Sequence, residues 1–156
     1  MQKIFLSFLF ILFFIPFSTA NDDITSIKKF FNIYVDSANN YKDDYFDYYC
    51  PNAKIIRVVE KDDGTLESVN IPLERYKKEA KKSRKLARLR KYKNTYFNIE
   101  IIPFGSDYKL TTLRMPSTSD YKIPAHFIIG KDSAGNWKIK EESMNTKVQK
   151  FLNKKE

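Results

Sequence analysis

The second half of the chain carries four runs rich in aromatic and β-branched residues, and the short gaps between them constrain the fold most. The runs cover 96–104, 108–115, 121–129 and 137–143, and such a composition favours β-strands. The connections at 105–107, 116–120 and 131–136 are too short for the helical crossovers that parallel strands need. We therefore predict an antiparallel meander of four strands.

The first half of the chain predicts helices around one hairpin. Large apolar side chains recur every three or four residues over 24–38, which is typical of a helix with one buried face. A short aromatic helical segment then leads to Pro51, and strands at 55–59 and 66–71 flank the turn signal Asp63-Gly64. Pro72 begins a third helix, which ends near Arg90, and a short helix is expected at 148–152. The order of elements indicates an α+β domain with helices on one face of a curved sheet.

This order resembles the nuclear transport factor 2-like superfamily, which includes ketosteroid isomerase, scytalone dehydratase, polyketide cyclases and many binding modules. The resemblance rests on the amphipathic stretch 24–38, on the aromatic segment leading into 49–53, and on the closing strand that begins at 135–139. It covers about residues 22–145 and implies a cone-like α+β fold, with three N-terminal helices and a hairpin packed on a curved, mostly antiparallel sheet. Function varies widely within the superfamily, so the resemblance implies a fold only.

The strand pattern also predicts which side chains face the helices. If Phe104 pairs with Tyr108 across the turn, one inner apolar face collects Phe97, Ile99, Ile101, Thr111, Leu113, Met115, Ala125, Phe127, Ile129, Trp137, Ile139 and Glu141. The outer face then collects Asn98, Glu100, Thr112, Arg114, His126, Lys138 and Lys140, together with the apolar Ile102, Leu110 and Ile128. Adding helix tyrosines, the residues expected to line a pocket are Tyr34, Tyr45, Phe97, Ile99, Leu113, Phe127, Trp137 and Ile139.

Glu141 is the candidate catalytic residue, because it is the carboxylate expected on the inner strand face. An apolar pocket would raise its pKa and suit it to acid or base chemistry. The alternative is that Glu141 is solvated or paired with a lysine, and this reading is preferred. His126 is expected to be a solvated or interface histidine on the outer face.

The resemblance adds little to the case for an enzyme. Ketosteroid isomerases use an aspartate base on the first hairpin, whereas the strand 54–59 contains no carboxylate before Glu60. Scytalone dehydratase-like sites need paired histidines, and His126 is the single histidine. Cys50 is the single cysteine, so no zinc or haem ligand set exists and no internal disulfide can form. We expect no metal or cofactor, and Cys50 is expected to be buried rather than joined to another chain.

A basic segment is the most unusual feature of the composition. Residues 77–93 contain ten Lys or Arg and one Glu, while the whole chain carries a formal charge of +9. The domain is therefore nearly neutral apart from one basic helix. The candidates for contact with a polyanion are Lys78, Lys81, Lys82, Lys85, Arg88, Arg90 and Lys91. A solvated helix face is the alternative.

Residues 1–20 read as a secretory signal peptide, with Lys3 before an apolar run and small residues at Ser18 and Ala20. The twelve residues 4–15, apolar except for Ser7, span about 18 Å as a helix, which is short of a bilayer core of about 30 Å. We therefore predict cleavage near Ala20, leaving one domain over 21–156 that is periplasmic or secreted. An uncleaved anchor is the alternative.

Three functions remain open at this point. The first is an exported, non-enzymatic binding module with a small apolar cavity, whose basic helix contacts an anionic envelope surface or an acidic protein. The second is a pocket isomerase, dehydratase or cyclase that uses Glu141, and the third is a subunit of an envelope assembly. Export argues against a nucleic-acid partner, and the sequence leaves open whether the chain forms a homodimer.

Overall fold

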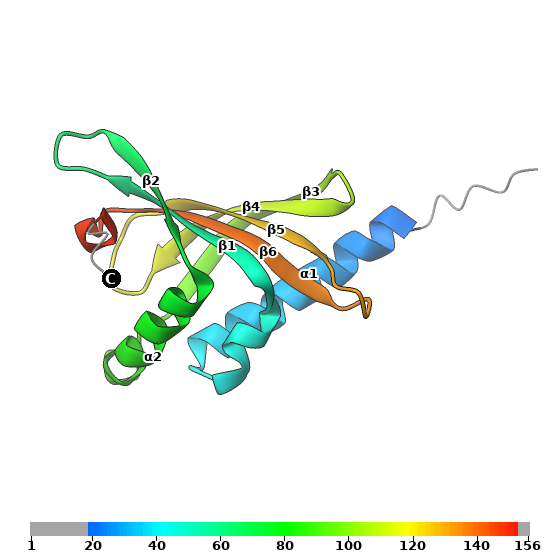
Figure 1. Cartoon of the computed structure of the whole chain (residues 1–156), viewed down its shortest axis with the longest axis horizontal. Coiled ribbons are helices and arrows are strands. Elements are labelled where there is room, and N and C mark those ends of the chain that lie inside the picture. The colour runs from blue at the N-terminus through cyan, green and yellow to red at the C-terminus, as the bar shows by residue number, and fades with distance from the viewer. Residues whose placement is uncertain (1–18, 153–156) are drawn as a thin grey trace, which may run out of the picture.

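The computed structural model describes residues 19–152, which fold as helices against one face of a six-stranded sheet (Figure 1). The helix α1 spans Thr19–Asn39, the 3-10 helix η1 spans Asp43–Tyr48, and α2 spans Leu73–Leu89. The predicted signal segment 1–20 lies outside the described residues apart from its last two positions, which begin α1. Within the described chain, no helix is long and apolar enough to cross a membrane.

The sheet is mostly antiparallel, with strand order β2-β1-β6-β5-β4-β3. The strands are β1 (Tyr49–Glu60), β2 (Leu66–Ile71), β3 (Asn94–Phe104), β4 (Asp107–Pro116), β5 (Ile123–Lys131) and β6 (Trp137–Thr146). The predicted hairpin and meander are both present, and a single parallel pairing, β1 with β6, joins them. A short 3-10 helix, η2 (Gln149–Leu152), follows β6. The predicted α+β fold class is confirmed.

The core lies between α1 and the middle strands. Ile27, Phe31 and Tyr34 occupy the buried face of α1, as the three- and four-residue spacing predicts. The Phe31 ring packs edge-on against Phe127 of β5, with 5.0 Å between centroids. Cys50 is buried and free, as expected for a small apolar residue.

The inner face differs from the prediction in β4 because the hairpin turn is one residue tighter than expected. Phe104 pairs with Asp107 rather than with Tyr108. Since side chains alternate, this shift of one residue exchanges the two faces of β4. Leu110, Thr112 and Arg114 therefore face inward, whereas the prediction placed all three outside. The predicted inward positions of Thr111, Leu113 and Met115 are wrong for the same reason.

A bulge in β3 changes one further predicted position, that of Phe97. Asn98 has a φ of 53°, a conformation that asparagine tolerates better than most residues, and the register slips between Phe97 and Glu100. Ile99 and Ile101, on the turn side of Asn98, pack against the core, as predicted. Phe97 instead lies opposite Leu113 on the outer face, where the Lys122 ammonium sits 4.5 Å from its ring centroid.

Candidate functional site

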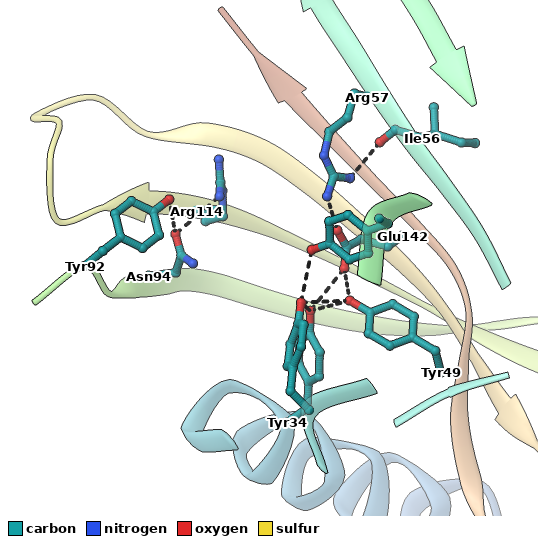
Figure 2. A network of polar contacts seen from close by, with 10 residues as sticks. Tyr34, Tyr49, Ile56, Arg57, Tyr92, Asn94, Arg114 and Glu142 are labelled. Carbon is teal, nitrogen blue, oxygen red and sulfur yellow. Dashed lines mark hydrogen bonds and ion pairs between the residues drawn. The ribbon is translucent and has the colours of Figure 1, made fainter. Parts of the chain in front are cut away.

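A buried polar network occupies the inner face where β1 and β6 run parallel (Figure 2). At its centre is Glu142, which is fully buried. Its Oε1 accepts a hydrogen bond from Arg57 Nη2 at 2.6 Å, and its Oε2 accepts hydrogen bonds from the hydroxyls of Tyr34, at 3.0 Å, and Tyr49. A buried charge is tolerated only when it is paired and hydrogen-bonded, and both conditions are met here.

Glu142 occupies the place that the sequence pattern assigned to Glu141, and a bulge in β6 is the cause. The register between β5 and β6 shifts between Ile128 and Ile129, so Ile139 and Glu142 both face inward although they are three residues apart. Glu141 points to the outer face, where its Oε1 lies 3.4 Å from Nε2 of His126. The predicted inward position of Glu141 is therefore wrong, while the outer position of His126 is confirmed. Strict alternation cannot reveal a bulge, so sequence reasoning missed Glu142.

Four tyrosine hydroxyls from different elements meet around Glu142. Tyr34 belongs to α1, Tyr45 to η1, Tyr49 to β1 and Tyr76 to α2. The hydroxyl of Tyr45 lies 3.2 Å from that of Tyr34, 3.1 Å from that of Tyr49 and 3.1 Å from that of Tyr76. The network thus ties three helices to the sheet.

The environment keeps these tyrosines protonated. Burial, and next to it the negative charge of Glu142, raises the pKa of Tyr34 and Tyr49 well above the usual value, and burial likewise raises the pKa of Tyr45. Burial alone would lower the pKa of Arg57, but the adjacent Glu142 carboxylate outweighs it and the pKa rises. The guanidinium therefore stays charged, and the phenols act as hydrogen-bond donors.

A cavity of about 520 Å³ lies next to this network, between α2, the inner sheet face and η2. Arg57 links the two features, because its guanidinium binds Glu142 on one side, stacks 5.2 Å from the ring centroid of Tyr76, and also lines the cavity. Glu142 itself is not among the lining residues. The apolar part of the wall is made by Ile71, Leu86, Ala87, Met144, Val148 and Phe151.

The polar part of the cavity wall is strongly cationic. Besides Arg57, it contains Arg75, Arg90, Arg114 and Lys150, against one carboxylate, Glu79. Glu79 has an ion-pair partner outside the cavity, because its Oε1 lies 3.5 Å from the Lys82 ammonium. The cavity is therefore a basic site with apolar walls.

Arg114 is held in the cavity wall through neutral groups. Its Nη1 donates to Asn94 Oδ1 at 3.2 Å, and that same oxygen accepts a hydrogen bond from the Tyr92 hydroxyl at 3.2 Å (Figure 2). The Nε of Arg114 is shielded from solvent and has no hydrogen-bond partner among the described residues. In the described part of the chain, no carboxylate forms an ion pair with Arg114. Its side chain therefore keeps unused charge and hydrogen-bonding capacity.

None of the eight residues predicted to line a pocket lines this cavity. Tyr34 belongs to the buried network, and Tyr45 belongs to it and also lines a smaller cavity of about 150 Å³. Four others are core residues or pack against the core, namely Ile99, Phe127, Trp137 and Ile139, whereas Phe97 and Leu113 face outward. Sequence reasoning placed the pocket too deep, where these large side chains fill the space.

Most of the basic segment 77–93 lies in α2, and the outermost ridge of this helix is formed by Lys78, Lys81, Lys82, Lys85 and Leu89. Leu89 is 79% exposed, and Leu86 beside the cavity is 49% exposed. Arg88 leans on the Tyr41 ring, with 5.8 Å between its Cζ and the ring centroid, Arg90 lines the cavity, and Lys91 is exposed just after the helix. The lysine ridge thus lies on the side of α2 away from the core.

The described residues bring together no group of three or more His, Cys, Asp or Glu side chains that could hold a metal ion.

Comparisons with known proteins identify the fold. No model of a known protein family matches the sequence, and no curated protein matches it. A solved nuclear transport factor 2-like protein of unknown function from Pseudomonas putida superimposes with a TM-score of 0.62 at 7% identity, covering 81% of this chain and 87% of its own. A nuclear transport factor 2-like protein with a cystatin-like fold from Novosphingobium aromaticivorans gives 0.58 at 8% identity, covering 80% and 82%. One from Cytophaga hutchinsonii gives 0.54 at 11% identity, covering 81% and 98%. Architecture and comparisons agree that this chain has the nuclear transport factor 2-like fold.

Proposed function

We propose that this chain is an exported, non-enzymatic binding module that holds a small molecule in the cavity beneath α2. The observation that carries the proposal is the cavity itself, about 520 Å³ in volume and lined by apolar side chains with a few polar groups. Ligand sites in proteins have this size, of the order of 300–1,000 Å³, and this mixed lining.

The buried network supports binding rather than catalysis. A general base must reach the proton that it removes, within hydrogen-bond distance or through one water. Glu142 has its carboxylate held by Arg57, Tyr34 and Tyr49, and it does not line the cavity. Glu141, the base of the alternative enzyme hypothesis, faces the other side of the sheet. The network instead fixes the position of Arg57, as supporting hydrogen bonds do in rigid sites.

Filling the cavity tests the proposal. N-phenyl-1-naphthylamine, an uncharged dye that fluoresces in apolar sites, is expected to bind the wild-type domain and to lose most of its binding in Ser83→Trp. Ser83 lines the cavity yet is exposed, so the indole can enter the space without displacing the core. Ser133→Trp, at an exposed turn position between β5 and β6, is the matched control. Equal dye binding by both variants, or no binding by the wild type, would contradict a ligand site in this cavity.

The lysine ridge of α2 is the second part of the proposed function, as a contact for an anionic envelope surface. Lysines near an anionic bilayer contribute about 1 kcal/mol each. Exposed Leu89 lies among these lysines, an arrangement typical of helices that rest in a membrane interface. The other partner considered, an acidic protein, would use the same charges.

Vesicles test this contact. The domain is expected to bind vesicles of phosphatidylcholine with 30% phosphatidylglycerol at low salt, and far less at physiological salt. Replacing Lys78, Lys81 and Lys85 by Gln should weaken binding about 100-fold, from about 1 kcal/mol per lysine. The control replaces Lys28, Lys29 and Lys54, which are exposed away from α2, and removes the same charge. Equal losses in both triple variants would show attraction by net charge alone.

Export is proposed from the first twenty residues. Cleavage after Ala20 would remove only the first two residues of α1 and leave its buried face complete. Sequencing the N-terminus of the secreted protein tests this, with Asn21 as the expected first residue.

A further inference from the structure

We infer that the cavity beneath α2 is a site for a small amphipathic anion, an apolar body carrying one anionic group that binds beside Arg114. This inference rests on the proposed function and adds the chemical class of the ligand. Two observations support it: the positive charge of the cavity wall, and the unmatched charge and unpaired Nε of Arg114.

The positive charge of the cavity wall favours a negatively charged ligand. Arg57 is already matched by Glu142, and Glu79 interacts with Lys82. Arg90, Arg114 and Lys150 also line the cavity, and none of the three forms an ion pair with a carboxylate of the described residues. Cations that line a cleft with apolar walls concentrate a positive potential there. A cationic ligand would meet repulsion, and a neutral ligand would gain nothing from this field.

Arg114 gives the anionic group a defined place. Its contact with Asn94 holds the guanidinium at the wall through a neutral side chain, so that its charge stays unmatched. Its Nε has no partner among the described residues although it is shielded from solvent. An unsatisfied, desolvated N–H is costly, and an anionic oxygen is the acceptor that binds a guanidinium most strongly.

The apolar wall defines the rest of the ligand. Ile71 and Met144 come from the sheet, Leu86 and Ala87 from α2, and Val148 and Phe151 from the C-terminal segment. A free inorganic anion would leave these side chains facing water. A ligand with an apolar chain or ring would cover them, and removing apolar surface from water is favourable.

The test compares eight-carbon compounds with different head groups, and acetate serves as the anion that lacks the apolar chain. Octanoate and octyl sulfate are expected to bind in calorimetric titrations, 1-octanol at least about 10-fold more weakly, and octyltrimethylammonium and acetate without measurable affinity. The difference follows from the strength of a hydrogen bond to a charged group. Octanoate and octyl sulfate also separate a carboxylate ligand from a sulfate or phosphate ligand.

Two arginine variants connect the preference to the wall. Arg114→Met should weaken octanoate binding about 10- to 100-fold without changing the affinity for 1-octanol. Lys109→Met, on the outer face of the same strand, removes the same charge and should change neither affinity by more than about twofold, as expected for a distant surface charge. Arg90→Met, at an exposed position of the wall, is the second variant and is used if Arg114→Met does not fold.

Failure of the inferred ligand class can be distinguished from failure of the proposed binding function. Equal affinity for octanoate and 1-octanol, or an unchanged octanoate affinity in the folded arginine variants, would overturn the ligand class while leaving a cavity that binds the uncharged dye. An absence of binding by every octyl compound and by the dye would overturn the proposed function together with this inference.

Discussion

Arg57 and Glu142 form an ion pair across the parallel strands β1 and β6, with Arg57 Nη2 2.6 Å from Glu142 Oε1 and side-chain exposures of 8% and 0%. Glu142 is at the centre of the tyrosine network, and Arg57 joins that network to the cavity wall. Because both charges are removed from water, each depends on the other. Breaking the pair is therefore expected to destabilise the fold and to free Arg57, which lines the cavity.

Removing one charge of this pair should destabilise the fold strongly. Glu142→Gln leaves the Arg57 guanidinium buried without a countercharge, and such losses cost about 3–5 kcal/mol. Urea unfolding at pH 7 measures the change. Glu141→Gln, one residue earlier on the outer face, is the matched control and should change the unfolding free energy by less than about 1 kcal/mol, as for a partly exposed surface contact.

The double variant Arg57→Met/Glu142→Gln should be more stable than Glu142→Gln alone, because it removes the orphaned cation and keeps an acceptor for the tyrosine hydroxyls. Additive losses in the two single variants and the double variant would show that the charges do not depend on each other.

The sequence predicted the fold because each element carries its own local signal. The spacing of Ile27, Phe31 and Tyr34 marks the buried face of α1, and Asp63-Gly64 and Pro72 mark the ends of elements. These signals act within a few residues, so one sequence suffices to identify them.

The candidate site could not be predicted in the same way, because it depends on register. The two-residue turn at Gly105-Ser106 moves Arg114 to the inner face, and the β6 bulge moves Glu142 there. Each shift changes every later position by one residue, and nothing in the composition of these strands marks it. Two adjacent glutamates in β6 were a usable signal, since a bulge decides which of them is buried.

Raising the pH should unfold the protein through the tyrosine network. Burial raises the pKa of Tyr34, Tyr45 and Tyr49 above the usual value near 10, so the folded state holds these protons more tightly than the unfolded chain. Their contribution to stability is complete below pH 10 and is lost as the pH rises above it. Urea midpoints measured from pH 8 to 11 should fall above about pH 10, with a shallower fall in Tyr49→Phe. A flat profile would contradict the buried network.

A glycine at the end of α2 should stabilise the protein. Lys91 has a φ of 51°, in the left-handed region that favours glycine after a helix. Lys91→Gly removes the steric cost of that conformation and should raise the unfolding free energy by up to about 1 kcal/mol. Arg90→Gly, where φ is −82°, is the control and should instead lower the unfolding free energy. A loss of stability in Lys91→Gly would show that the lysine side chain contributes more than its backbone conformation costs.

Tyr41 should matter for stability because it joins the end of α1 to the end of α2. Its hydroxyl lies 3.0 Å from the carbonyl oxygen of Ala87 and 2.6 Å from that of Tyr92, so one proton serves two acceptors. Tyr41→Phe removes this donor and should lower the unfolding free energy by about 0.5–1.5 kcal/mol. Tyr121→Phe, whose ring is 44% exposed, is the matched control and should have almost no effect in the same urea titration. If the two variants lose stability equally, the hydroxyl of Tyr41 does not hold α2 in place, and the helix is kept over the cavity by its apolar contacts alone.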